Sequence, residues 1–134
     1  MSGAHKLVIE NVSRVFPAVQ GGQPVTALQP TDLTVAPNDF VTILGPSGCG
    51  KSTLLRMIAG LDRPTTGRIM LDGRAVAGPG ADRGMVFQSY TLFPWLTIRQ
   101  NIGFGLREKG MSAAASREII DRYIAAVGLK GFEN

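Results

Sequence analysis

Short apolar runs separated by turn residues make up the first part of the chain. Strand-like segments lie at residues 6–10, 14–18, 25–28 and 31–36. Residues 20–24, a Gln-Gly-Gly-Gln-Pro cluster, are typical of a turn, and Pro30 and Pro37 interrupt the later segments. Because segments that flank such a turn pair as a hairpin, this region predicts an antiparallel sheet.

The next apolar run is continuous and leads into a glycine-rich loop. Residues 40–44, Phe-Val-Thr-Ile-Leu, are typical of a strand buried on both faces of a mostly parallel sheet. After the loop, residues 52–59 have the apolar spacing of a helix, and Gly60 stands where a left-handed cap belongs. The apolar positions of this helix are Leu54, Leu55 and Ile58. The pattern therefore predicts a strand, a loop and a helix in succession.

Strands and turns continue after this helix. Residues 68–71 and 85–87 are strand-like, and the loop at 78–84 between them favours neither helix nor strand. Asp72-Gly73 is a turn signal directly after the first of these strands. We therefore expect residues 68–71 to end in a turn.

A longer helix is predicted near the end of the sequence. Ser112 can cap a helix that extends through Val127, and Gly128 ends it. Its predicted apolar stripe consists of Ile120, Ile124 and Val127. Strands that alternate with helices indicate the α/β class.

The composition is that of a folded domain. Hydrophobic residues make up 44% and charged residues 18% of the 134 residues, and the mean hydropathy is +0.11. No apolar stretch approaches the roughly 18 residues of a membrane span, and residues 1–6 lack the apolar segment of a secretory signal. The single cysteine excludes an internal disulfide. The net charge of +4 comes from scattered lysines and arginines, so no nucleic-acid partner is expected.

The glycine-rich loop carries the clearest chemistry. Residues 45–52, Gly-Pro-Ser-Gly-Cys-Gly-Lys-Ser, fit the G-x-x-x-x-G-K-[ST] pattern of the phosphate-binding loop called Walker A. Glycines let successive N–H groups turn toward an anion, and the following helix N-terminus favours the same charge. Lys51 can contact the β- and γ-phosphates, and the Ser52 hydroxyl suits Mg²⁺. The predicted nucleotide-binding residues of the loop are Gly45, Pro46, Ser47, Gly48, Cys49, Gly50, Lys51, Ser52 and Thr53.

Two polar residues carry weaker signals. Cys49 occupies a variable position of the loop, and we interpret it as a small space-filling residue without a catalytic role. Gln88 follows the strand-like residues 85–87 and opens a loop. Its amide could ligate Mg²⁺ and orient the attacking water, or Gln88 is an ordinary polar loop residue.

Three runs of sequence resemble the nucleotide-binding subunits of ATP-binding-cassette importers. They are residues 44–61, residues 78–88, and residues 92–98 together with 101–106. The similarity extends from about Leu7 to Asn134 and is greatest for the branch that imports nitrate, sulfonate, taurine and bicarbonate. The resemblance implies a P-loop nucleoside-triphosphatase core of the α/β class with an N-terminal antiparallel β subdomain.

The family's functional positions can be carried over to this sequence. The resemblance implies that residues 1–134 are the N-terminal part of one nucleotide-binding domain, with the phosphate loop at 45–53 and the start of a helical subdomain at about 97–130. It makes Gln88 the Q-loop glutamine, which contacts Mg²⁺ and acts in catalysis together with Lys51. Phe16 falls where the family has an aromatic residue that stacks on adenine. The alternative is that Phe16 is a core aromatic of the β-rich part.

Three family motifs are missing from the 134 residues: the LSGGQ signature, the Asp-Glu of the Walker B strand, and a late switch histidine. Residues 20–23 are only superficially similar to the signature, because they precede the phosphate loop and run into a proline. Residues 69–72 have the apolar run of a Walker B strand, but Gly73 stands where the glutamate belongs. We therefore expect the first half of a cassette, stopped before the Walker B strand, that is inactive alone and poorly soluble or multimeric.

The resemblance also implies a function and partners. It implies an ATP- and Mg²⁺-dependent, energy-coupling subunit of an importer for nitrate, sulfonate, taurine or a similar small anion, peripheral on the cytoplasmic face of the membrane. The implied partners are a second nucleotide-binding subunit, permease subunits and, indirectly, a solute-binding protein. The alternative is a truncated remnant that binds nucleotide weakly or not at all. A GTPase is disfavoured because the sequence has no Asn-Lys-x-Asp or Asp-x-x-Gly motif, and a small-molecule kinase because it has no arginine-rich lid.

Overall fold

The computed structural model describes residues 5–19, 21–89 and 91–134. The chain divides into two compact units, Met1–Met85 and Val86–Asn134. Gln20, in the predicted turn at 20–24, and residues 1–4 of the N-terminal segment lie outside the described residues.

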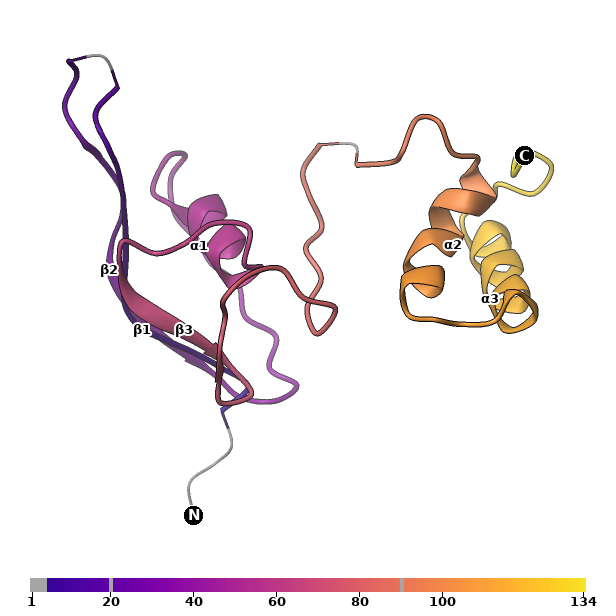
Figure 1. The fold of residues 1–134 in the computed structure, drawn as a ribbon, viewed down its shortest axis with the longest axis horizontal. Helices are drawn as coiled ribbons and strands as arrows, with labels where there is room; N and C mark the ends of the chain where they lie inside the picture. Colours follow the sequence, from indigo (N-terminus) through magenta and orange to yellow (C-terminus); the bar gives the residue numbers. More distant parts are fainter. Residues whose placement is uncertain (1–4, 20, 90) are drawn as a thin grey trace. The chain divides into compact units, whose positions relative to one another are not determined.

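The first unit contains a four-stranded antiparallel sheet in the order β2-β1-β3-β4 (Figure 1). The strands are β1 (Leu7–Phe16), β2 (Val25–Val35), β3 (Thr66–Leu71) and β4 (Arg74–Ala75). The predicted hairpin and antiparallel sheet are therefore confirmed. The division of each arm into two short strands is wrong, because β1 and β2 each run through without a break.

Pro30 does not interrupt β2 because the strand bulges there. Val12 pairs with Thr31, and Arg14 pairs with Leu28, so two residues of β2 oppose one residue of β1 at this point. A bulge leaves a residue outside the ladder, and proline has no N–H to give to the ladder. The strand therefore continues past a residue that would break a regular central strand.

Helix α1 (Lys51–Ile58) packs on one face of this sheet (Figure 1). The core comprises Ile9, Val12, Leu28, Leu54, Met57 and Ile69, with Leu7, Leu33, Ile43, Ile58 and Val76 packed against it. The helix is confirmed, but Leu55 is 47% exposed, and Met57 is buried instead. Residues three and four apart lie on the same helix face, so Met57 and Ile58 pack against the core together with Leu54. Leu55 lies on another face and is more exposed.

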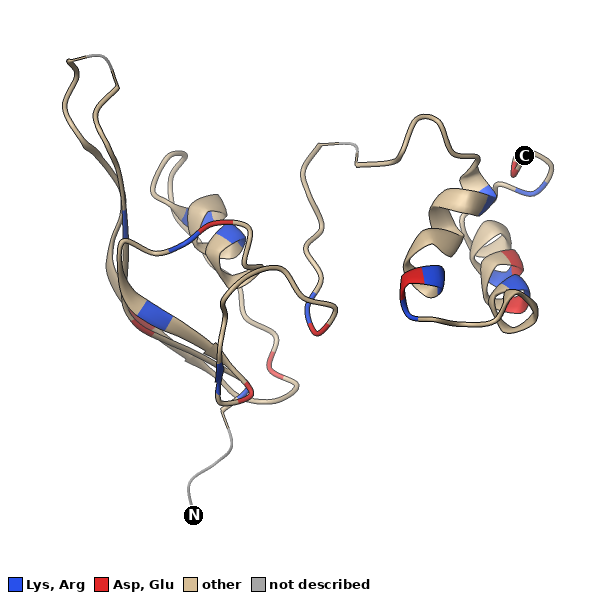
Figure 2. Cartoon of the chain, in the orientation of Figure 1, with Lys and Arg blue, Asp and Glu red and all other residues tan. Residues whose placement is uncertain are grey.

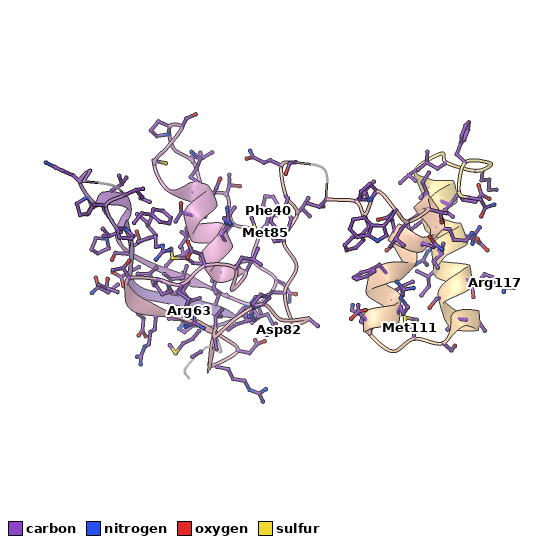
Figure 3. The ribbon with its side chains drawn as sticks, turned by 45° about the horizontal axis from the view of Figure 1, so that its top comes forward. Phe40, Arg63, Asp82, Met85, Met111 and Arg117 are labelled. Carbon is purple, nitrogen blue, oxygen red and sulfur yellow. The ribbon has the colours of Figure 1, made fainter. Side chains whose placement is uncertain are left out.

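Residues 40–44 and 85–87 were predicted as strands and are irregular instead. The backbone at 40–44 pairs with no strand in the described part of the chain, and Phe40 (labelled in Figure 3) is 96% exposed. Val86 is 97% exposed. Only Ile43 of the first run packs against the core. A buried strand requires neighbours on both edges, and the four strands of the sheet pair with one another.

The turn that follows β3 is confirmed. Asp72 and Gly73 have φ values of 49° and 74°, which are the left-handed conformations of a tight hairpin turn, and β4 follows. The Lys6 ammonium contacts the Asp72 carboxylate at 2.6 Å. Asp72 therefore lies in the turn of a hairpin directly after β3. This agrees with the prediction that residues 69–72 are not a Walker B strand.

The second unit is a pair of helices, α2 (Ile98–Glu108) and α3 (Ala113–Ala126), which lie side by side (Figure 1). Ser112 caps α3 as predicted, and Ile120 and Ile124 are buried. Val127 is the C-cap residue that follows Ala126 and is 60% exposed, so this end of the predicted stripe is not buried. Arg99 of α2 contacts Asp121 of α3 at 2.6 Å.

Asn101 fixes the segment that leads into α2. Its side-chain oxygen accepts from the N–H of Phe93 at 2.9 Å, and its amide nitrogen donates to the carbonyls of Phe93, Leu96 and Thr97 at 3.0–3.2 Å. Thr97 and Gln100 then form a reciprocal capping box at the helix start. The helix is therefore anchored by side chains rather than by burial.

Candidate functional site

The glycine-rich loop lies against the hairpin of the first unit. Gly50 has a φ of 97°, and a Cβ there would lie 2.4 Å from the carbonyl oxygen of Ala27 and 3.0 Å from the Leu28 side chain. Both constraints exclude any side chain at this position, since the obstructing oxygen belongs to the backbone. The close approach brings the end of the loop against β2.

Lys51 reaches back across the loop. Its ammonium nitrogen donates to the carbonyl oxygens of Gly45 at 2.6 Å and Pro46 at 2.7 Å, and it lies 3.5 Å from the sulfur of Cys49. An ammonium has three donors, and a thiol is a weak acceptor. Two protons are therefore held by the loop, and the third is available to a stronger acceptor such as a phosphate oxygen.

The start of α1 suits an anion. Its N-cap residue, Gly50, makes no side-chain capping bond, and no acidic residue lies in the first turn. The first-turn N–H groups and the positive end of the helix dipole consequently carry no protein counter-charge. These residues fit a phosphate group, which would supply both the acceptor oxygens and the negative charge.

The loop residues Ser52 and Cys49 both lie at the surface. The exposed Ser52 hydroxyl is a hard oxygen of the kind that Mg²⁺ prefers. Cys49 covers Gly45, because a Cβ on that glycine would lie 2.7 Å from the Cys49 sulfur. This contact agrees with a space-filling role for Cys49.

Phe16 ends β1 and is 39% exposed, so it is outside the core. It pairs with Val25 of β2, and Arg14, two residues earlier, pairs with Leu28. Gly50 of the loop lies close to Ala27 and Leu28 of the same strand. The hairpin thus brings the end of β1 and the phosphate loop to the same part of the first unit.

Sequence reasoning missed a cluster beside Phe16. The Arg14 guanidinium lies over the Phe16 ring, 4.5 Å from its centroid, and pairs with Asp62, which follows α1. The only sequence signal was the spacing of Arg14 and Phe16, which puts their side chains on one face of a strand. Arg14 and Asp62 are 48 positions apart in the sequence, so no sequence signal indicated the other contact.

Gln88 lies in the second unit, in the irregular segment before α2, and its side chain is exposed. The expectation that Gln88 follows a strand is wrong, because residues 85–87 are irregular, although Gln88 does lie in a loop. Its role as a Mg²⁺ ligand stays a prediction.

A glycine-rich loop that is hydrogen-bonded by its own lysine, at a helix start without a side-chain cap, is the arrangement of the P-loop class of proteins. The family model described as ABC transporter matches residues 28–134, and the chain belongs to this family.

Similar proteins include importer subunits. The chain is 53% identical over 129 residues to an uncharacterised ABC transporter ATP-binding protein of Methanocaldococcus jannaschii, covering 96% of this chain and 48% of the relative. It is 50% identical to the nitrate import ATP-binding protein NrtD of Synechocystis, covering 94% and 47%. It is 43% identical to the taurine import ATP-binding protein TauB of Pelagibacter ubique, covering 96% and 48%. The chain thus spans about half the length of the curated relatives it matches.

Solved cassettes share the fold. A dimeric bacterial ABC transporter cassette matches with a TM-score of 0.81 at 30% identity, over 96% of this chain and 60% of that one. The same coverage and a TM-score of 0.80 are found for a dimeric post-hydrolysis cassette bound to ADP and phosphate. The predicted fold class, an ATP-binding cassette with an antiparallel N-terminal sheet, is therefore confirmed.

The surfaces of the two units carry mixed charges (Figure 2), and the second unit also has an apolar groove. Figure 2 shows basic residues interspersed with acidic ones over the described part of both units. No helix among the described residues is long and apolar enough to cross a membrane. The second unit carries an apolar groove of about 600 Å³, lined by Leu92, Ile98, Ile102, Leu106, Val127 and Leu129 among others.

Proposed function

We propose that this chain binds ATP with Mg²⁺ through residues 45–53 as the nucleotide-binding part of an ABC importer subunit. The observation that carries the proposal is the Lys51 ammonium, which two loop carbonyls hold at 2.6 and 2.7 Å while its third donor has only the weak acceptor sulfur of Cys49, at 3.5 Å. A triphosphate supplies the acceptor and the charge that this arrangement lacks.

Each predicted site residue then has a role. Lys51 contacts the β- and γ-phosphates, and the loop N–H groups surround them. Ser52 would hold Mg²⁺, and the metal would neutralise phosphate charge. Gln88 is also proposed as a Mg²⁺ ligand. Phe16 would stack on adenine, which its exposure and its place beside the loop support.

The domain assignment is proposed in the same way. Residues 1–134 would form the N-terminal part of one nucleotide-binding domain, and α2 and α3 would begin its helical subdomain at about 97–130. The solved dimeric cassettes support pairing with a second nucleotide-binding subunit. In the complete form, a homodimer, the LSGGQ motif of the second subunit would complete the site.

We further propose that the complete assembly imports a small anion such as nitrate, a sulfonate or taurine. The names of the relatives support this substrate class. The subunit would sit on the cytoplasmic face of the membrane beneath permease subunits and serve a solute-binding protein indirectly. The apolar groove of the second unit is the kind of surface that another protein covers.

The chain of 134 residues alone should bind nucleotide without turning it over. It carries no Asp-Glu pair after an apolar strand and no late histidine, so the attacking water has no base. The competing function is a remnant without useful nucleotide affinity. The lysine geometry favours binding over that alternative.

Isothermal titration of the purified chain with MgATP tests the proposal. Lys51→Ala should weaken ATP binding about 10- to 100-fold, because a charge-assisted hydrogen bond contributes roughly 1.5–3 kcal/mol. Lys6→Ala is the matched control, since Lys6 pairs with Asp72 at the end of the sheet. Equal affinities for the wild type and Lys51→Ala would refute the site. Phosphate release above the Lys51→Ala level would refute the predicted inactivity.

A further inference from the structure

Arg14 and Phe16 form a stacked pair at the end of β1. The guanidinium carbon of Arg14 lies 4.5 Å from the centroid of the Phe16 ring. At this distance the cation covers one face of the ring and is attracted by its electrons. The Phe16 side chain is still 39% exposed, so part of the ring remains open.

Asp62 holds the Arg14 guanidinium at two points. Its Oδ1 lies 2.8 Å from one terminal nitrogen of Arg14, and its Oδ2 accepts from Nε at 3.2 Å. The N–H of Arg63 donates to the same Oδ1 at 2.8 Å, so the carboxylate itself is oriented. Both side chains of the pair are about four-fifths buried, with exposures of 22% and 20%. A two-point contact in this setting fixes the plane of the guanidinium.

The segment that carries Asp62 is fastened to β1 on both sides of Arg14. The N–H of Thr65 donates to the carbonyl of Ser13 at 2.8 Å, and the N–H of Val15 donates to the Thr65 hydroxyl at 2.9 Å. The hydroxyls of Ser13 and Thr66 are 2.7 Å apart. These bonds hold the backbone that follows Asp62 against β1, which keeps the carboxylate close to Arg14.

We infer that Arg14, clamped by Asp62, is a positioning residue for the adenine base, because it lies over the ring of Phe16, a residue that stays 39% exposed. The inference rests on the proposed function of the phosphate loop. The clamp ties the end of α1, the helix that begins at the phosphate loop, to the ring that would meet the base. The Arg14–Asp62 clamp should therefore affect the affinity for the adenine base and leave the affinity for the phosphates unchanged.

Titration of the full chain with two probes, MgATP and magnesium tripolyphosphate, tests the inference. Tripolyphosphate has the phosphates without the base. Arg14→Met and Asp62→Asn should each weaken MgATP binding about 3- to 10-fold, from the usual size of a cation–aromatic contact, and leave tripolyphosphate binding unchanged. Arg14→Lys should fall between Arg14→Met and the wild type, since it keeps the charge and loses the two-point contact. Arg68→Met is the matched control, because Arg68 is an exposed arginine of the same sheet that pairs with Glu10.

A second arm uses Phe16→Ala. In that background Arg14→Met should have no further effect on MgATP binding, because the ring through which it acts is gone. The inference is overturned if Arg14→Met binds MgATP as well as or better than wild type, weakens both probes equally, or acts undiminished without Phe16. Circular dichroism shows whether each variant is folded. If Arg14→Met is unfolded, the two titrations of Asp62→Asn test the inference in its place. A wild-type chain that binds neither probe overturns the proposed function itself, and this inference with it.

Discussion

Strand β1 and the run at residues 40–44 have similar apolar sequences and opposite structures. Ile9 in β1 is 1% exposed and has strands on both edges, whereas Phe40 is 96% and Leu44 86% exposed in an irregular segment. The backbone groups of β1 are paired with β2 and β3, and no strand of the described residues pairs with 40–44. An apolar run therefore specifies a tendency to become a strand, and pairing partners decide the outcome.

The largest expected effect separates the two regions by stability. Ile9→Ala should lower the free energy of unfolding by about 2–5 kcal/mol, because it leaves a cavity in the core beside Val12 and Met57. Phe40→Ala should change it by less than about 0.5 kcal/mol, since the ring makes little contact. Urea unfolding followed by circular dichroism measures both. A cost for Phe40→Ala equal to that of Ile9→Ala would mean that residues 40–44 are packed after all.

A second prediction concerns amide hydrogen exchange. The central amides of β1 should exchange at least about a hundredfold more slowly than those of residues 40–44, because exchange requires the sheet to open. Deuterium uptake of peptides that cover each segment gives the comparison. The β2 edge strand serves as an internal reference. Slow exchange at 40–44 would contradict the irregular structure and restore the predicted strand.

A proline placed in the irregular run is also expected to have only a small effect. Val41→Pro should lower stability by less than about 1 kcal/mol, since this segment gives no N–H to a ladder. The paired control is Val8→Pro, which removes a donor from a strand with neighbours on both sides and should cost about 3 kcal/mol or more. Thermal unfolding of the two variants side by side decides the matter. Similar losses in both would show that the run is hydrogen-bonded.

The features that were predicted correctly are local in sequence. The succession of glycine-rich loop and helix α1, the hairpin and the capped helix at Ser112 all depend on short-range signals. The failures are non-local. Whether residues 40–44 are buried depends on pairing with strands that are distant in the sequence. The Arg14–Asp62 clamp joins positions that are 48 residues apart. The choice of Met57 over Leu55 depends on which helix face meets the sheet. None of these can be read from the residues concerned without the fold.

The anchoring of Lys51 has a consequence for the speed of ligand capture. A free lysine side chain loses roughly 1.5–2 kcal/mol of rotamer entropy when it is ordered. In this loop the carbonyls of Gly45 and Pro46 already restrain the side chain, so that loss belongs to folding and not to ligand association. A phosphate arriving at the loop meets a cation already in position. Association should therefore be limited by encounter and respond strongly to ionic strength, as expected for a fixed charge that attracts an anion through solvent.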